Sequence, residues 1–285
     1  MPLFFSENTT EGLSMPYTSN NGVNIYFETY GEGEPIVLIR GLGGTVSGWA
    51  SQVRHLSDDY QTILIDNRGA GESDKPDEEY SLDIFALDLK SVLDEIGIKK
   101  THILGLSMGG FIVQRFYSLY PEMVQSMTLG CTGTGLSDPA HIMFTPELEE
   151  ILNTERTDEN RDYLISKMNE YFFHPEFAKN NQKFMEMVFL DAKNKKQPAH
   201  AYMRQFKACY SDTHLSPLLK NINVPTSILH GDEDVVVPIE NAHFLHQNIE
   251  GSELNIFHKA GHMFFLEKEQ EFNSTVREFI QRHPM

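Results

Sequence analysis

The feature that most constrains the fold of this chain is the pentapeptide 105–109, which reads Gly-Leu-Ser-Met-Gly. An apolar run of strand length precedes it at 102–106, and a stretch with helical periodicity follows at 111–120. A serine in so tight a strand–turn–helix connection must adopt a strained backbone, and side chains two residues to either side would collide with the strand and the helix. The pattern therefore predicts that Ser107 projects from the turn beside a helix N-terminus, which favours negative charge. The alternative is a chance match in an ordinary loop.

Apolar runs of strand length recur along the chain and alternate with stretches of helical periodicity. The fully apolar run 36–39 is typical of a buried parallel strand, whereas 23–30 alternates like a half-buried strand. Residues 81–96 carry an apolar stripe at helical spacing. This alternation predicts an α/β fold with a mostly parallel sheet and helices on both of its faces. The other predicted elements are strands at 62–66, 102–106, 126–130, 226–230 and 254–257 and helices at 240–249 and 267–282.

The pattern changes between residues 132 and 223, where strand-like runs are few and charges are frequent. We interpret this segment as a helical cap inserted after the sixth strand, so that residues 1–131 and 224–285 form the two parts of one core domain. Most of the aromatic residues of the cap are expected to form its own core. Phe144 and Tyr210 are predicted to line the substrate pocket instead. The predicted cap helices are 146–153, 161–171, 181–191 and 200–209.

The charge and cysteine content exclude several kinds of partner. The 285 residues carry a formal net charge of −18, which argues against nucleic acid and anionic membrane surfaces. The two cysteines, Cys131 and Cys209, are too few for a disulfide framework and are expected to be buried free thiols in a reducing compartment. Neither a secretory signal nor an apolar run of transmembrane length is found in the sequence. We therefore predict a cytoplasmic protein.

A glycine-rich loop, 40–44, follows the strand at 36–39. It does not have the Gly-x-Gly-x-x-Gly spacing of a dinucleotide site, and no P-loop lysine follows it. Acyl transfer needs two backbone N–H donors aimed at the position where a carbonyl oxygen becomes anionic. We predict that Leu42 supplies one donor and Met108, the residue after the serine, supplies the other. The alternative is a plain glycine turn.

Three residues suited to nucleophilic catalysis follow strands of the predicted sheet. A serine hydroxyl is a weak nucleophile at neutral pH, so it needs a histidine base and an acid that orients the histidine. In a sheet of this kind the chain order is serine, acid, histidine. Ser107 follows one strand, Asp234 follows a later one, and His262 follows the last. These three residues are the predicted catalytic triad.

Other residues near the predicted acid compete for the same roles. The chain has twelve histidines, and His230 is the main rival base, although its place at the end of a strand indicates a structural role. Asp232 and Glu233 compete with Asp234 as the orienting acid. A metal site built from His230, Asp232 and Asp234 is disfavoured because no second cluster of ligands accompanies it.

Five segments in this order, 40–44, 66–73, 105–110, 231–238 and 261–262, resemble the α/β-hydrolase superfamily over nearly the whole chain. The resemblance implies an eight-stranded, mostly parallel sheet with a helical cap, and it selects Asp234 as the acid three residues after a glycine. The Ser-Met-Gly-Gly sequence is similar to that of 3-oxoadipate enol-lactonases, small carboxylesterases and cofactor-free haloperoxidases. In this family the oxyanion loop usually begins His-Gly, and here Arg40 replaces the histidine. Arg40 is either a structural substitute or a binding residue for an anionic substrate.

The resemblance implies hydrolysis of a small carboxylic ester or lactone through an acyl-enzyme, with no cofactor and no metal. Two alternatives remain. The same triad hydrolyses the carbon–carbon bond of vinylogous diketones, and a ligand receptor or regulator can keep the triad while turning over slowly. The substrate is left open because cap residues shape the pocket. Whether the chain forms a homodimer is also left open.

Overall fold

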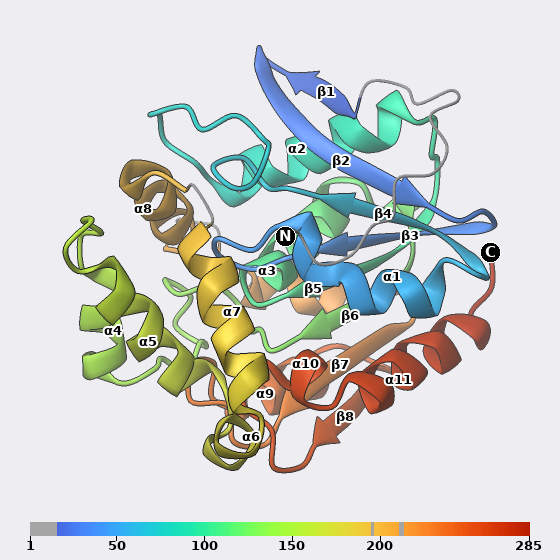
Figure 1. Ribbon diagram of the computed structural model, residues 1–285. Helices are drawn as coiled ribbons and strands as arrows, with labels where there is room; N and C mark the ends of the chain where they lie inside the picture. Colours follow the sequence, from blue (N-terminus) through green and yellow to red (C-terminus); the bar gives the residue numbers. More distant parts are fainter. Residues whose placement is uncertain (1–15, 195–196, 211–213) are drawn as a thin grey trace.

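The centre of the protein is one twisted sheet of eight strands in the order β1-β2-β4-β3-β5-β6-β7-β8 (Figure 1). The computed structural model describes residues 16–194, 197–210 and 214–285. β2 pairs antiparallel with β1 and with β4, and all other neighbouring strands run parallel, which confirms the predicted fold class. The strands are β1 (Tyr17–Asn20), β2 (Val23–Tyr30), β3 (Glu34–Ile39), β4 (Tyr60–Ile65), β5 (Thr101–Leu106), β6 (Val124–Gly130), β7 (Thr226–Gly231) and β8 (Glu253–Phe257).

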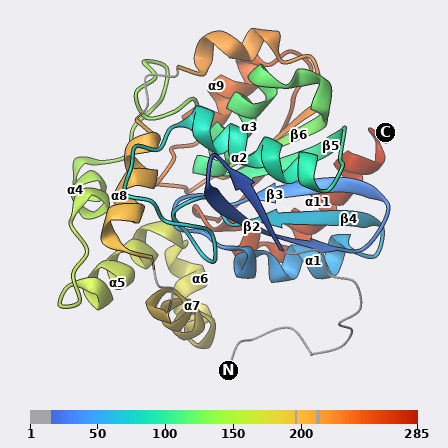
Figure 2. The ribbon, with the colours of Figure 1, turned by 90° about the horizontal axis from the view of Figure 1, so that it is seen from above.

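Both faces of the sheet are covered by helices, as the unbroken apolar run in β3 indicates. Successive side chains of a strand point to opposite faces, so Val37 and Ile39 join one core cluster and Ile36 and Leu38 join the other. The first face packs against α2, α3 and α9, and the second against α1, α10 and α11 (Figure 2). These helices are α1 (Ala50–Leu56), α2 (Leu82–Glu95), α3 (Met108–Leu119), α9 (Glu240–Asn248), α10 (Phe264–Glu267) and α11 (Glu269–Gln281), and 3-10 turns occur at η1 (Val46–Trp49), η2 (Pro121–Met123) and η3 (Ser216–Asn221).

The segment between β6 and β7 is helical wherever it forms regular structure in the described residues. Its five helices lie together at the left of both ribbon views, beside the sheet (Figures 1 and 2). Four of them fall within a few residues of the predicted positions, and the short α6 was not predicted from the sequence. These helices are α4 (Pro146–Asn153), α5 (Arg161–Phe172), α6 (Pro175–Asn180), α7 (Gln182–Asn194) and α8 (Ala199–Ala208).

Helix α8 forms hydrogen bonds that connect the cap to the glycine-rich loop that follows β3. The Gln205 side chain accepts a hydrogen bond from the Gly43 amide at 2.9 Å and donates one to the Arg68 carbonyl at 2.8 Å. Gln197 adds a bond to the Gly69 carbonyl. The cap therefore contacts loops at the carboxyl ends of the strands. In the part of the chain that the structure describes, no helix combines the length and apolar character needed to cross a membrane.

Candidate active site

Ser107 occupies the apex of the turn between β5 and α3 with an unusual backbone conformation. Its φ is 56° and its ψ is −121°. A non-glycine residue with such angles costs on the order of 1–3 kcal/mol and persists only where surrounding contacts enforce it. The Ser107 amide donates to the Gly130 carbonyl at 2.9 Å, and the Ser107 carbonyl accepts bonds from the Gly110 amide and the Thr132 hydroxyl, each at 2.8 Å. The strained turn predicted from the pentapeptide is thus present.

The glycines around Ser107 are required by close backbone contacts. A Cβ atom at Gly105 would lie 2.3 Å from the Gly109 carbonyl oxygen, and one at Gly109 would lie 2.3 Å from the Ile39 carbonyl oxygen. A Cβ at Gly41 would lie 2.8 Å from the Ser107 Cβ and 3.3 Å from its Oγ. The glycine-rich loop after β3 therefore lies directly against the serine.

The two predicted oxyanion donors flank this contact. Leu42 follows Gly41 in the loop, and Met108 follows Ser107 as the first residue of α3. Within residues 16–194, 197–210 and 214–285, neither amide has a protein acceptor, whereas the neighbouring Gly43 amide is bound by Gln205. An oxyanion requires two N–H donors that no other protein group has taken.

His262 and Asp234 form a buried pair in the loops that follow β8 and β7. The His262 Nδ1 donates to Asp234 Oδ2 at 2.8 Å, and each residue is 5 % exposed. The other oxygen of Asp234 accepts the amides of Val236 at 2.8 Å and Val237 at 2.9 Å. The carboxylate is thereby fixed, and a proton held on Nδ1 leaves Nε2 of His262 to act as a base.

The neighbouring residues that compete with this pair point to other partners. Asp232 binds the exposed His258 at 2.9 Å, and Glu233 binds His174 at 3.1 Å. His230 donates from Nε2 to the Val237 carbonyl at 2.7 Å, the same nitrogen lies 3.4 Å from Asp234 Oδ2, and burial lowers the pKa of this histidine. His230 therefore supports the loop that carries the acid. The described residues contain no group of three or more histidine, cysteine or acidic side chains placed to hold a metal ion.

Ser107 precedes the cap insertion and His262 follows it, and both lie in loops after the carboxyl ends of their strands, β5 and β8. In the described structure Ser107 Oγ forms no hydrogen bond with His262. Such contacts are often long in unliganded sites and shorten when substrate binds.

An apolar cluster of cap and loop residues lies beside the predicted oxyanion loop; we call it the cap cluster. Phe144 belongs to it and is 9 % exposed, and Leu42 and Tyr210 pack against it. The Tyr210 hydroxyl donates to Glu149 at 3.2 Å. The buried members are Phe144, Leu148, Leu152, Tyr202, Phe206, Val236 and Val237.

One contact of the cap with the predicted triad has no signal in the sequence. The ring of Phe172, the last residue of α5, lies 5.4 Å from the imidazole of His262. The same residue's carbonyl accepts the Met263 amide at 2.9 Å. The cap contains many aromatic residues, and the sequence does not distinguish Phe172 from the others. Only the three-dimensional structure identifies Phe172 as a neighbour of His262.

Arg40 is buried, and its guanidinium lies near the faces of two aromatic rings that adjoin each other. Its Cζ atom is 5.1 Å from the Trp49 ring centroid and 4.6 Å from that of Phe265. Nε and Nη1 have no hydrogen-bond partner among the described residues, and burial lowers the pKa of Arg40 to about 10. Stacking of this kind stabilises a desolvated cation. A role of Arg40 in binding an anionic substrate stays a prediction.

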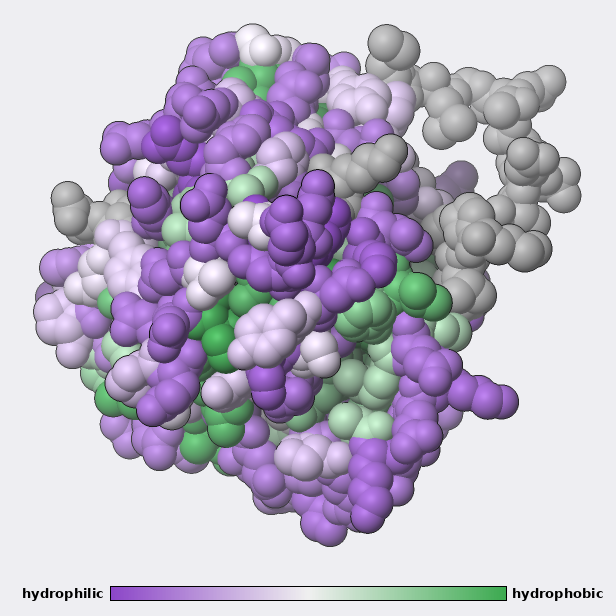
Figure 3. All heavy atoms as spheres, turned by 60° about the vertical axis from the view of Figure 1, so that its left-hand side comes forward, coloured by the Kyte–Doolittle hydropathy of each residue, from purple (hydrophilic) through white to green (hydrophobic). Residues whose placement is uncertain are grey.

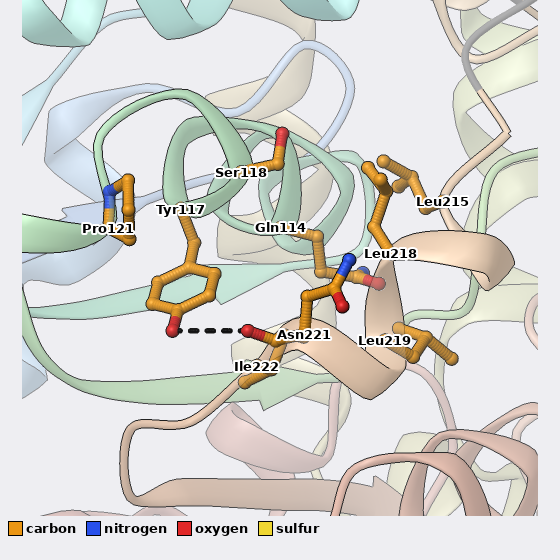
Figure 4. Close-up of a pocket in the computed structure, with 9 residues that line it drawn as sticks. All are labelled: Gln114, Tyr117, Ser118, Pro121, Leu215, Leu218, Leu219, Asn221 and Ile222. Carbon is orange, nitrogen blue, oxygen red and sulfur yellow. Dashed lines mark hydrogen bonds between the residues drawn. The ribbon is translucent and has the colours of Figure 1, made fainter.

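Figure 3 brings the cap side forward and shows apolar surface emerging between polar side chains. Exposed apolar residues of the cap and the acid loop include Met187, Leu190 and Val235. A separate pocket of about 140 Å³ lies between α3 and η3, where the Tyr117 hydroxyl donates to the Asn221 carbonyl (Figure 4). None of the predicted site residues lines that pocket.

Comparison with known proteins identifies the class that this fold and site define. The sequence profile described as the alpha/beta hydrolase fold matches residues 34–269. The chain therefore belongs to the α/β-hydrolase family, as the five sequence segments predicted.

Individual relatives include hydrolases of several kinds. The chain is 32% identical over 279 residues to a 2-hydroxy-6-oxononadienedioate/2-hydroxy-6-oxononatrienedioate hydrolase of Klebsiella pneumoniae, covering 91% of this chain and 92% of the relative. A structure described as Est816, an N-acyl homoserine lactone degrading enzyme, is 28% identical with a TM-score of 0.79, covering 93% of this chain and all of that one. The enol-lactonase of Burkholderia xenovorans has the same fold, with a TM-score of 0.81 at 24% identity over 93% of this chain and 99% of that one.

Proposed function

We propose that this protein is a serine hydrolase that cleaves a carboxylic ester or lactone of a small molecule. The observation that carries the proposal is the strained Ser107, held at a φ of 56° with the glycine loop against its Oγ. A fold maintains such strain at a reactive position more readily than at a structural one. The buried Asp234–His262 pair at 2.8 Å supplies the base that a serine nucleophile needs.

The proposed reaction proceeds in two halves. Ser107 Oγ attacks the substrate carbonyl while Nε2 of His262 takes its proton, and the amides of Leu42 and Met108 bind the oxygen that becomes anionic. The tetrahedral intermediate collapses, and His262 returns the proton to the leaving alkoxide, which departs as the alcohol. Water then attacks the acyl-enzyme with His262 as base and releases the carboxylic acid. In a lactone, acid and alcohol leave as one hydroxy acid. Asp234 holds the imidazole in the productive tautomer throughout.

The apolar surroundings of Leu42 favour a substrate with an apolar acyl or alcohol group. Ligand pockets are mostly apolar with a few placed polar groups, and the cap cluster, against which Leu42 packs, is apolar. The Klebsiella relative is named for dioate substrates, which carry two carboxylates. Carbon–carbon bond hydrolysis of a vinylogous diketone is therefore the second candidate, and the buried cation of Arg40 is the observation that favours it.

One experiment tests the proposal and separates the candidates. The purified protein is treated with a serine-directed phosphonate, and the modified residue is located by mass spectrometry. The same preparation is assayed on p-nitrophenyl esters of increasing chain length, on lactones, and on a vinylogous diketone with product analysis. Labelling of Ser107 together with ester or lactone turnover supports the proposal. Turnover of the diketone alone moves the assignment to carbon–carbon hydrolysis. Ligand-induced stabilisation without turnover indicates a receptor.

We further propose a cytoplasmic location. Cys131 and Cys209 are both buried free thiols in the structure, as expected of a reducing compartment. Cell fractionation tests the location, and recovery in a secreted fraction would contradict it.

A further inference from the structure

A short segment of the cap, 172–174, lies directly against the loop that carries the proposed base. The Phe172 carbonyl accepts the amide of Met263, the residue after His262, at 2.9 Å. A Cβ atom at Gly261 would lie 2.9 Å from the His174 amide nitrogen and 3.0 Å from the Phe172 carbonyl oxygen. Only a glycine before His262 allows the cap backbone to approach so closely.

Glu267 joins the same two segments through its carboxylate. Its Oε1 accepts the amide of His174, in the cap, at 3.1 Å and the amide of Gly261, in the histidine loop, at 3.2 Å. Its Oε2 accepts the Gly261 amide as well, also at 3.2 Å. One side chain from the end of α10 therefore binds backbone groups on both sides of the contact between cap and core.

The His174 side chain extends this connection to the loop of the acid. Its Nδ1 accepts the Glu176 amide at 3.2 Å, which caps α6, and its Nε2 donates to Glu233 at 3.1 Å. Glu233 immediately precedes Asp234. The cap segment thus binds residues adjacent to both His262 and Asp234, while His262 and Asp234 bind each other.

We propose that Glu267 is a positioning residue that couples the cap segment 172–174 to His262. The position of His262 then depends on the position of this cap segment. This inference rests on the proposed function. The Phe172 ring, 5.4 Å from the imidazole, shows how a shift of the segment reaches the base. A displacement of about 1 Å from productive geometry can lower turnover by about 10²-fold.

Two substitutions at one position test the coupling. In Glu267→Gln the amide oxygen can still accept both N–H groups, whereas Glu267→Ala leaves both without an acceptor. We expect kcat within about threefold of wild type for the glutamine variant and a loss on the order of 10–100-fold for the alanine variant. The rate of phosphonate labelling of Ser107 should fall in parallel, because it also needs the base. Glu271→Gln is the matched control, because Glu271 is exposed on α11 and among the described residues only its backbone, not its side chain, forms a hydrogen bond, for example with the Thr275 hydroxyl.

Amide hydrogen exchange reports the same coupling without any turnover. In Glu267→Ala the amides of Gly261, Met263 and His174 should lose protection together, and in Glu271→Gln they should not. Unchanged protection of Met263 in the alanine variant would overturn the coupling, whatever the activity of the enzyme. If wild type neither hydrolyses any substrate nor takes the phosphonate, the proposed function fails instead.

A merely structural role for Glu267 predicts a different pattern. In that case Glu267→Ala would lower the melting midpoint, while kcat and the labelling rate stay within twofold of wild type well below that midpoint, and the proposal would be wrong. If the alanine variant does not fold, Glu267→Asp provides the test instead. Its side chain is one methylene shorter, so the carboxylate lies farther from the two amides. A loss of kcat with little change in KM is expected there, and an unchanged kcat overturns the proposal.

Discussion

Ser126 Oγ lies 2.7 Å from Nδ1 of His102, and both side chains are buried. Nε2 of the same histidine lies 3.3 Å from Glu34, so serine, histidine and acid stand in a row near the amino ends of the strands. Burial lowers the pKa of His102. The Ser107 turn has the backbone strain and the adjacent unpaired amides that this second group does not show. A serine–histidine contact alone therefore does not define a site.

This comparison supplies a control for the nucleophile. Ser107→Ala should lower turnover by about a million-fold, because the attacking oxygen is removed. Ser126→Ala should keep full activity, with a loss of stability of about 1–3 kcal/mol from the buried partner left on His102. Esterase assays and urea titrations of both variants check these values. More than a few per cent residual activity in purified Ser107→Ala would exclude Ser107 as nucleophile.

The acid is tested by comparing two aspartates in one loop. Asp234→Asn should favour the wrong tautomer of His262 and lower kcat by about ten-thousand-fold. Asp232→Asn should change kcat only a few-fold, because Asp232 contacts the exposed His258. Both variants are assayed side by side at one pH. The reverse ranking would move the acid to Asp232.

Cap aromatics are expected to set substrate preference. Phe144→Leu and Tyr210→Phe should change the preferred acyl or alcohol group, because Phe144 belongs to the cap cluster and Tyr210, like Leu42, packs against it. Phosphonate labelling of Ser107 should persist, since it needs only the core loops. Tyr163→Phe is the control, because Tyr163 is 60 % exposed on α5 and does not belong to the cap cluster. A substrate panel and a melting curve are measured on each variant. An unchanged profile with a lowered midpoint in the first two would assign them to packing alone.

His141 should make stability depend on pH. Burial lowers its pKa from 6.5 to about 4, although Asp138 opposes the shift. The unfolded chain therefore binds a proton on this residue between pH 6.5 and 4 that the folded chain does not. Stability is fully present above pH 6.5 and falls as the pH drops, by at most about 3 kcal/mol from this group. Urea titrations of wild type and His141→Asn measure the difference. A difference independent of pH from 7 to 4 would show that His141 is not buried neutral.

The sequence predicted the positions of the proposed catalytic residues because each follows an apolar strand. Parallel strands end at one edge of a sheet, so residues after β5, β7 and β8 are expected at that edge whatever the structure of the cap. The Gly-x-Ser-x-Gly pattern also predicted the strained turn, since the glycines at 105 and 109 have no room for a side chain.

Elements without periodicity were missed. β1 has only four residues and follows the undescribed N-terminal segment, so its alternation is too short to detect. α6 has six residues and begins at a proline capped by His174, a residue outside the usual capping set. The contacts of Glu267 are missed for another reason. They join backbone amides 93 and 6 residues away, and backbone groups leave no trace in side-chain patterns.

The insertion of the cap between β6 and β7 also determines the order in which the site is built during synthesis. β6 pairs with β7, beginning at Met127 and Thr226. This pairing cannot form until the whole cap has been synthesised. An edge strand that stays unpaired for so long is a template for wrong pairing. The serine turn is synthesised early, but its base and acid arrive only with the last part of the chain. A nascent or truncated chain that ends within the cap therefore carries the serine without the means to activate it.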